Sequence, residues 1–180
     1  MVAGGKSDVA LKWVSLLGQR SDLDYVASGD LYRLLVLLTI AGEDIPEPFS
    51  ISQTSLDVWT GLPDELTTLE KGEIATRLLV TLSALGYELP IGVWERMIGK
   101  VPSSINVLIP NTPLRYQLRE AATSGRIAET ALLSLIVIGS KGPQKSGPIQ
   151  LNAAIRALRI VGLEEEARNL AIEATVSILN

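Results

Sequence analysis

The sequence predicts an all-α fold, built as an array of antiparallel α-hairpins. Three observations lead to this class: apolar residues recur at helical three-four spacing, the segments that carry this spacing stop at glycines, and no segment shows sustained strand-like alternation. Glycine most readily takes the left-handed conformation that ends a helix. Because three Trp, four Tyr and one Phe are the only aromatic residues, the core is expected to be aliphatic.

Five segments combine the helical pattern with a closing glycine, namely residues 9–18, 30–42, 71–86, 113–125 and 149–162. After the last two glycines a second helical pattern begins at once, over residues 126–138 and 163–179. This succession is typical of a tight helical hairpin. Pro90 is suited to open a further short helix that holds Trp94, which we expect in the core.

Proline- and glycine-rich stretches separate these helices and predict long irregular loops near residues 45–63 and 99–112. We expect residues 1–6 to be a flexible lead-in or tag remnant and residues 7–180 to form a single all-α domain. Within it, residues 113–180 form a pair of related helical hairpins. We also expect the chain to be the C-terminal part of a longer protein. The absence of cysteine fits a soluble protein of either the cytoplasm or the periplasm.

An internal repeat supports the hairpin array. Residues 114–137 align with residues 151–174 at an offset of 37, which matches Gly125 to Gly162 and Glu129 to Glu166. Both units read as helix, glycine turn, helix. Such self-similarity is the sequence signature of repeat architectures.

The second unit resembles the turn and second helix of a tetratricopeptide repeat. In that family a turn glycine is followed five residues later by a small residue and seven further on by another, and Ala167 and Ala174 stand at these places after Gly162. In the first unit Thr130 and Val137 depart from this pattern. The resemblance spans about residues 114–174. It implies an α-solenoid, whose concave groove holds short peptides or partner helices.

Composition removes most common catalytic chemistry, because the chain has no cysteine and no histidine. Thiol nucleophiles, imidazole bases and Cys/His zinc sites are therefore excluded, and no cofactor or metal site is predicted. A net charge of −4 with interspersed charges argues against nucleic acid as a partner. The longest apolar stretches, residues 34–41 and 131–138, are shorter than the roughly 20 residues that cross a bilayer, so no membrane insertion is expected. Both stretches predict buried helices.

These observations predict a non-enzymatic protein–protein interaction or scaffold module. One alternative is a self-association domain that forms a homo-oligomer, in which the aliphatic C-terminal helix pairs with its own copy if its outer face is uncovered. The second is a helical accessory domain, or a carboxylate-using enzyme domain that acts on a polysaccharide. The acidic groups at residues 43–44, 64–65 and 164–166 lie near predicted turns and helix starts, where the helix dipole favours carboxylates without any catalytic role.

Four arginines and one tryptophan are the candidate partner-binding residues. Arg33 and Arg77 lie nine residues before a turn glycine, and Arg119 and Arg156 lie six before theirs. Since nine and six differ by three, the four share about one helix face and predict a ladder that receives carboxylates of a protein or peptide. The alternative is that each arginine pairs with an acid of a neighbouring hairpin. Trp59, in a predicted loop, either lies in an interface or attaches that loop to the helices.

Overall fold

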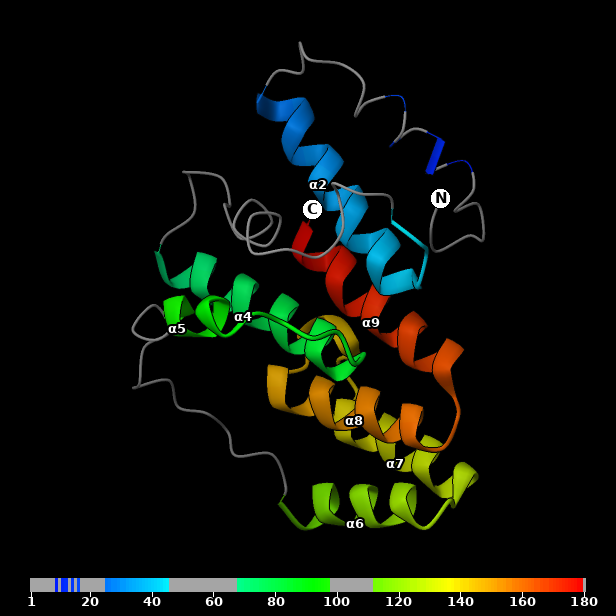
Figure 1. The fold of residues 1–180 in the computed structure, drawn as a ribbon. Coiled ribbons are helices and arrows are strands. Elements are labelled where there is room, and N and C mark those ends of the chain that lie inside the picture. The colour runs from blue at the N-terminus through cyan, green and yellow to red at the C-terminus, as the bar shows by residue number, and fades with distance from the viewer. Residues whose placement is uncertain are drawn as a thin grey trace.

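A computed structural model describes residues 9, 11, 12, 14, 16, 25–45, 68–97 and 112–179. Every regular element among these residues is helical, which confirms the all-α class (Figure 1). The elements are α2 (Tyr25–Ala41), α4 (Thr68–Ala84), α5 (Ile91–Met97), α6 (Thr112–Thr123), α7 (Ile127–Ile138), the 3-10 turn η2 (Pro143–Lys145), α8 (Pro148–Ile160) and α9 (Glu164–Leu179). Most of segment 9–18 and of the two predicted long loops lies outside the described residues.

Four of the glycines that end these helices are those that the sequence predicts, and Gly139 ends a further helix, α7. Gly42, Gly86, Gly125 and Gly162 all have positive φ, between +70° and +89°. At Gly86 the amide N–H donates to the Ser83 carbonyl at 3.0 Å, and the next N–H donates to the Leu82 carbonyl at 3.1 Å. This pair of hydrogen bonds is typical of a helix that ends at a residue in the left-handed conformation. The predicted closing glycine at position 18 lies outside the described residues.

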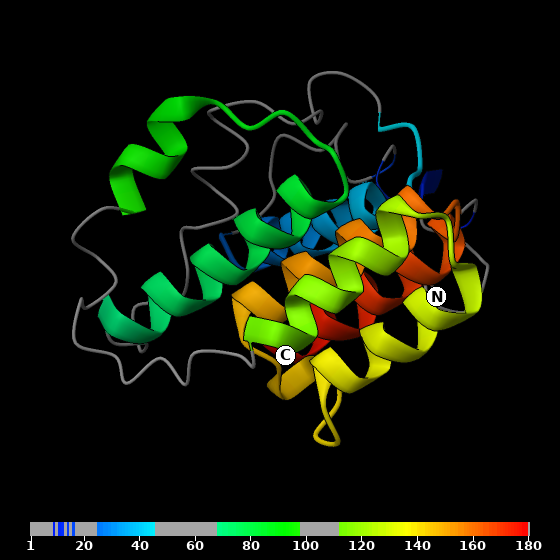
Figure 2. The ribbon, with the colours of Figure 1, turned by 90° about the horizontal axis from the view of Figure 1, so that it is seen from below.

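The helices are not stacked in chain order. The hairpin α6/α7 packs on α8, α8 packs on α9 and α4, and α9 packs on α2 (Figures 1 and 2). The last hairpin of the chain, α8/α9, therefore lies in the middle, between α6/α7 on one side and the earlier helices α2 and α4 on the other. As a result α6/α7 lies at one end of the array.

Burial follows this order. The main core lies between α2, α4, α8 and α9, and its fully buried side chains include Leu35, Leu79, Leu82, Leu151 and Ile155. A smaller cluster of Leu118, Ala122, Val137 and Ala157 joins α6 and α7 to α8. Trp94 packs partly buried against the main core, close to what the sequence predicts.

Two arginines attach the central hairpin to the ends of other helices. Arg159 Nη1 donates to the Ala84 carbonyl at 3.0 Å, and Arg168 Nη1 donates to the Ile40 carbonyl at 2.9 Å. The Glu164 carboxylate forms an ion pair with each of them. Its Oε2 lies 2.9 Å from Arg159 Nε, and its Oε1 lies 2.9 Å from Arg168 Nη2. Because the last carbonyls of a helix have no partner within the helix, this arginine–glutamate cluster completes the ends of α4 and α2.

The α6/α7 hairpin lacks the residues for such a cluster. At the repeat offset, the positions of Arg159, Glu164 and Arg168 are occupied by three apolar residues. These are Ala122, Ile127 and Ala131. The two hairpins thus share a turn and a spacing, but within the described residues only α8/α9 carries polar anchors to helices on its far side.

The apolar helices differ from one another in burial. In the C-terminal helix, Ala171 and Ile172 are buried against the rest of the core, so these two residues are not available to pair with a second copy. The stretch at residues 34–41 is largely buried as predicted, whereas the stretch at 131–138 is not: Leu132 and Leu135 are more than half exposed. The reason is position, because α7 belongs to the hairpin at the end of the array.

Candidate partner-binding surfaces

Three arginines lie on two packed helices. Arg115 and Arg119 are one turn apart on α6, and Arg156 is on α8, against which α6 packs. Arg119 and Arg156 are exposed, and Arg115 is half-buried with its Nε shielded from solvent. We call these three residues the arginine face.

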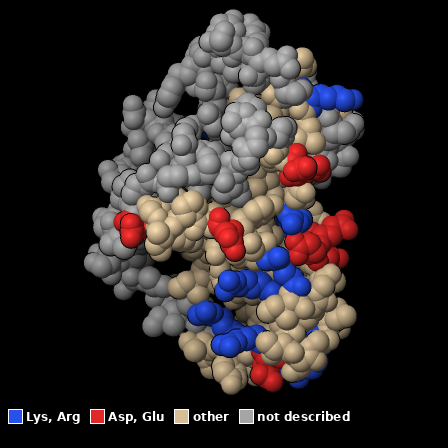
Figure 3. Space-filling view, viewed as in Figure 1, with Lys and Arg blue, Asp and Glu red and all other residues tan. Residues whose placement is uncertain are grey.

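The guanidinium groups of the arginine face have no partner among the described residues. Within the part of the chain that the structure describes, none of the three makes a hydrogen bond or ion pair. Figure 3 shows basic side chains gathered over α8 and α6 on this side of the molecule. Guanidinium groups bind carboxylates through paired hydrogen bonds, so this surface is suited to an acidic ligand.

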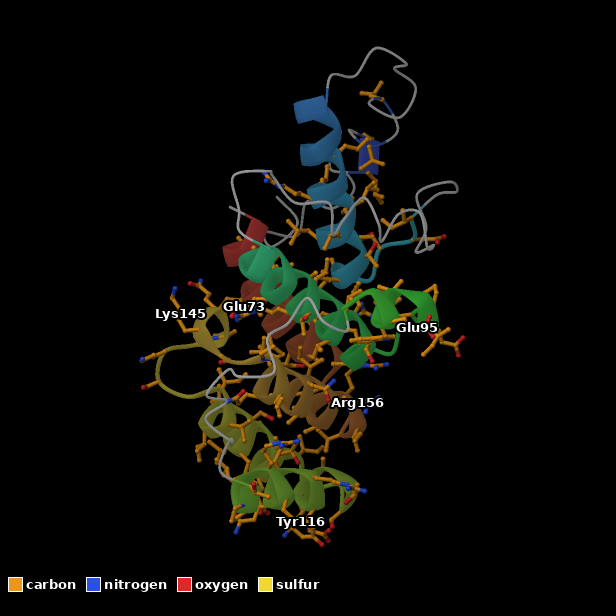
Figure 4. All side chains as sticks on the ribbon, turned by 90° about the vertical axis from the view of Figure 1, so that its left-hand side faces the viewer. Glu73, Glu95, Tyr116, Lys145 and Arg156 are labelled. Carbon is orange, nitrogen blue, oxygen red and sulfur yellow. The ribbon has the colours of Figure 1, made fainter. Side chains whose placement is uncertain are left out.

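Arg77 lies apart from this face. Its Nη2 donates to the carbonyl of Pro143 in η2, which attaches the α7–α8 loop to α4. Burial lowers the pKa of the Arg77 guanidinium below its ordinary value. In Figure 4, Lys145 of the same η2 turn and Arg156 lie on opposite sides of the molecule. Arg77 therefore holds the α7–α8 loop against α4, and its hydrogen-bond partner is a backbone carbonyl rather than a carboxylate.

The other two predicted site residues are not brought to the arginine face either. Arg33 is half-buried on α2, which packs against α9. Trp59 lies outside the described residues. Of the predicted ladder, the structure brings Arg119 and Arg156 onto neighbouring helices and adds Arg115.

A second surface is apolar and lies on α7. Its outward residues are Ala128, Leu132, Leu135 and Ile136, which we call the α7 outer face. The three large ones are 63%, 66% and 59% exposed. Exposed aliphatic side chains are ordinary when scattered, but a contiguous group of them is typical of an interaction site.

The inward face of α7 is more polar than its outward face. Thr130 and Ser134 are buried, and among the described residues neither hydroxyl finds a hydrogen-bond partner. Buried hydroxyls without partners destabilise the fold. The usual arrangement, with apolar residues inside and polar residues outside, is thus partly inverted on this helix.

The matching helix of the second hairpin serves as an internal reference. At the repeat offset, the α7 outer face corresponds to Glu165, Asn169, Ile172 and Glu173 of α9. Three of these are polar and exposed, and the apolar one, Ile172, is only 7% exposed. At the exposed positions of this set, α9 therefore carries polar residues, whereas α7 carries aliphatic residues.

A hollow of about 520 Å³ lies beside the C-terminal half of α7. Leu135 and Ile136 form its α7 wall, and Pro143, Leu170 and Glu173 are among the residues that complete it. The hollow is continuous with the α7 outer face. Together they form one mainly apolar surface at the end of the array.

The acidic residues of α9 lie at the start of that helix. Glu164, Glu165 and Glu166 form the first turn of this helix, as the sequence predicts. Asp64 and Glu65 lie outside the described residues. Across the described ranges, acidic residues form no group of three or more that could hold a metal ion, and none of the helices there is long and apolar enough to cross a membrane.

No protein-family model, curated protein or solved structure matches this chain.

Sequence reasoning missed the arginine–glutamate cluster and the α7 outer face. Arg159 and Glu164 flank a turn, and Glu164 and Arg168 have helical i, i+4 spacing, so part of the cluster is visible in the sequence. The signal for α7 is the contrast with α9 at the repeat offset, where Leu132 replaces Asn169 and Ile136 replaces Glu173.

Proposed function

We propose that this protein is a non-enzymatic protein–protein interaction or scaffold module, a solenoid-like array of helical hairpins whose arginine face receives an acidic protein or peptide. The observation that carries the proposal is the set of three guanidinium groups on the packed helices α6 and α8 that have no partner within the described part of the chain. Arg119 and Arg156 are the two members that the sequence also selects.

The chain itself supports the choice of a carboxylate ligand. Arg159 and Arg168 are each bound to Glu164, whose two oxygens take one guanidinium group each. Arg115, Arg119 and Arg156 lie on two packed helices and have no such acid among the described residues, and like charges repel one another. A partner that supplies carboxylates relieves this repulsion and adds charge-assisted hydrogen bonds.

A protein partner fits better than nucleic acid. The arginine face consists of three side chains on a chain of net charge −4. Nucleic-acid-binding domains typically carry a longer basic stripe and a basic overall charge, because affinity grows with the number of neutralised phosphates. A short acidic peptide matches the extent of this face.

The test measures binding of a fluorescent deca-glutamate peptide by anisotropy at several salt concentrations. We expect the double variant Arg119→Ala/Arg156→Ala to weaken binding roughly tenfold and to flatten its salt dependence, because charged contacts across an interface are screened by salt. Unfolding free energy should change by about 0–1 kcal/mol per exposed arginine.

A matched control removes the same charge elsewhere. Arg126→Ala/Lys141→Ala also removes two exposed positive charges, but from the two ends of α7. We expect this variant to keep peptide affinity within about twofold, since distant surface charges are largely screened. Equal weakening in both double variants, or no binding by the unaltered protein, contradicts the proposal. Tighter binding of a single-stranded RNA oligonucleotide than of the peptide contradicts the protein class of partner.

A further inference from the structure

The α7 outer face has the spacing of a helix–helix seam. Within the helix, Ala128, Leu132 and Leu135 follow one another at intervals of four and three residues, and Gly125 and Gly139 lie in the turns that flank the helix. This spacing keeps a stripe of residues facing a partner helix. A methyl group added at Gly125 or Gly139 would meet nothing within 4 Å, so both ends of the stripe face open space. The face is therefore suited to another helix that runs alongside α7.

The sizes of the seam residues indicate the direction of that helix. The N-terminal half of the stripe is small, with Ala128, and the C-terminal half is large, with Leu135 and Ile136. If two α7 helices cross antiparallel with a two-fold axis near Leu132, the small half of each lies against the large half of the other. A parallel pair would place large residues against large and leave the small halves apart. The face is thus self-complementary in the antiparallel sense.

The α7 outer face also lacks the charge that would repel a second copy of it. Arg126 and Glu129, at the N-terminal end of α7, form an ion pair at 3.3 Å. The rest of α7 carries no charged residue. A neutral surface does not repel an identical surface, whereas the arginine face would repel its own copy. The two surfaces therefore suit different partners.

The position of the hairpin α6/α7 in the array also favours contact with a second copy. Hairpin arrays bury a continuous core only between neighbours, and their terminal units need a polar outer surface or a further neighbour. The hairpin α6/α7 lies at the end of this array, and the exposed residues of α7 are mostly aliphatic. A second α6/α7 hairpin supplies the missing neighbour.

From these four observations we infer that two copies of this chain associate through the α7 outer face, with the two α7 helices packed antiparallel about a two-fold axis near Leu132. The contact is short, because α7 has 12 residues and so spans roughly 18 Å. One helix face buries less than the ~800 Å² per partner of a standard interface. The dimer is therefore weak, with dissociation expected at roughly micromolar to millimolar concentration.

Sedimentation equilibrium over a concentration series tests this dimer. We expect the unaltered protein to dimerise and Leu132→Arg to weaken dimerisation at least tenfold, because it places two like charges beside the two-fold axis. The matched control is Asn169→Arg, the same substitution at the equivalent exposed position of α9, which should leave the dimer unchanged. Both sites are exposed, so circular dichroism should show folded protein in each case.

Crosslinking then tests the direction of the helices. Since the natural chain has no cysteine, single cysteines can be placed freely. Mixed Ala128→Cys and Leu135→Cys proteins should form a disulfide between the two variants under mild oxidation, while Ala128→Cys alone should not, because disulfides need Cα atoms within about 7 Å. A protein that remains monomeric at millimolar concentration overturns the inference, as does a dimer that Leu132→Arg leaves intact or one in which Ala128→Cys alone crosslinks. Each of these results leaves the arginine-face proposal standing, since peptide binding is measured separately.

Discussion

The two related hairpins have the same local design and different neighbours. Both close their first helix at a left-handed glycine, and both place small or buried residues at Thr130 and Ala167, the matching contact positions. The second helix of the central hairpin, α9, packs against α8, α2, α4 and η2, whereas α7 packs against α6 and α8. This difference teaches that burial in a repeat depends on the unit's place in the stack.

The largest expected effect compares one matched pair of residues. Ile172 and Leu135 occupy equivalent positions, and the two residues are 7% and 66% exposed. We expect Ile172→Ala to lower the free energy of unfolding by about 2–4 kcal/mol, because it leaves a cavity in the core. Leu135→Ala should lower it by about 0.5 kcal/mol or less. Urea denaturation in dilute solution, where the monomer prevails, measures both. Similar losses would show that α7 is covered within the monomer.

The next effect compares two turn glycines. Gly86→Ala and Gly125→Ala both place a side chain at positive φ, which costs about 1–2 kcal/mol. At Gly86 the new methyl would lie 2.6 Å from Arg159 Nη1, and at Gly125 it would meet nothing within 4 Å. We expect Gly86→Ala to lose about 1–2 kcal/mol more, because the arginine must leave its carbonyl or carboxylate partner.

A double-mutant cycle isolates that difference. In an Arg159→Ala background, Gly86→Ala should cost no more than Gly125→Ala does, because the clash is gone. If the excess cost persists without the arginine, the arginine–glutamate cluster does not cause it. Chemical denaturation of the four proteins gives the comparison.

The smallest effect concerns the polar inward face of α7. Thr130 Oγ1 has no hydrogen-bond partner among the described residues, whereas Thr175 Oγ1 of α9 donates to the Ala171 carbonyl at 2.8 Å. We expect Thr130→Val to be neutral or to stabilise by up to about 1 kcal/mol, and Thr175→Val to destabilise by about 0.5–1.5 kcal/mol. Thermal melting followed by circular dichroism distinguishes them. A clear loss in Thr130→Val would mean that this hydroxyl has a partner after all.

The candidate sites show how far sequence reasoning reaches. Their distance from a turn glycine selects Arg119 and Arg156, and both lie on packed helices. The same distance rule selects Arg77, whose guanidinium binds the Pro143 carbonyl instead. Helical spacing predicts the face of a helix that a residue occupies, but it carries no information on the segment that lies against that face.

The sequence by itself determined the helices and their glycine ends, because both depend on local properties: the 3.6-residue period and the left-handed conformation at Gly42, Gly86, Gly125 and Gly162. Tertiary structure alone decided the stacking order, and with it which arginines are partnered. Arg159 and Arg168 bind carbonyls that lie 75 and 128 residues away in the chain. Leu135 is exposed and Ile172 is buried for the same reason. At these two equivalent positions, exposure depends on which helices pack against the residue.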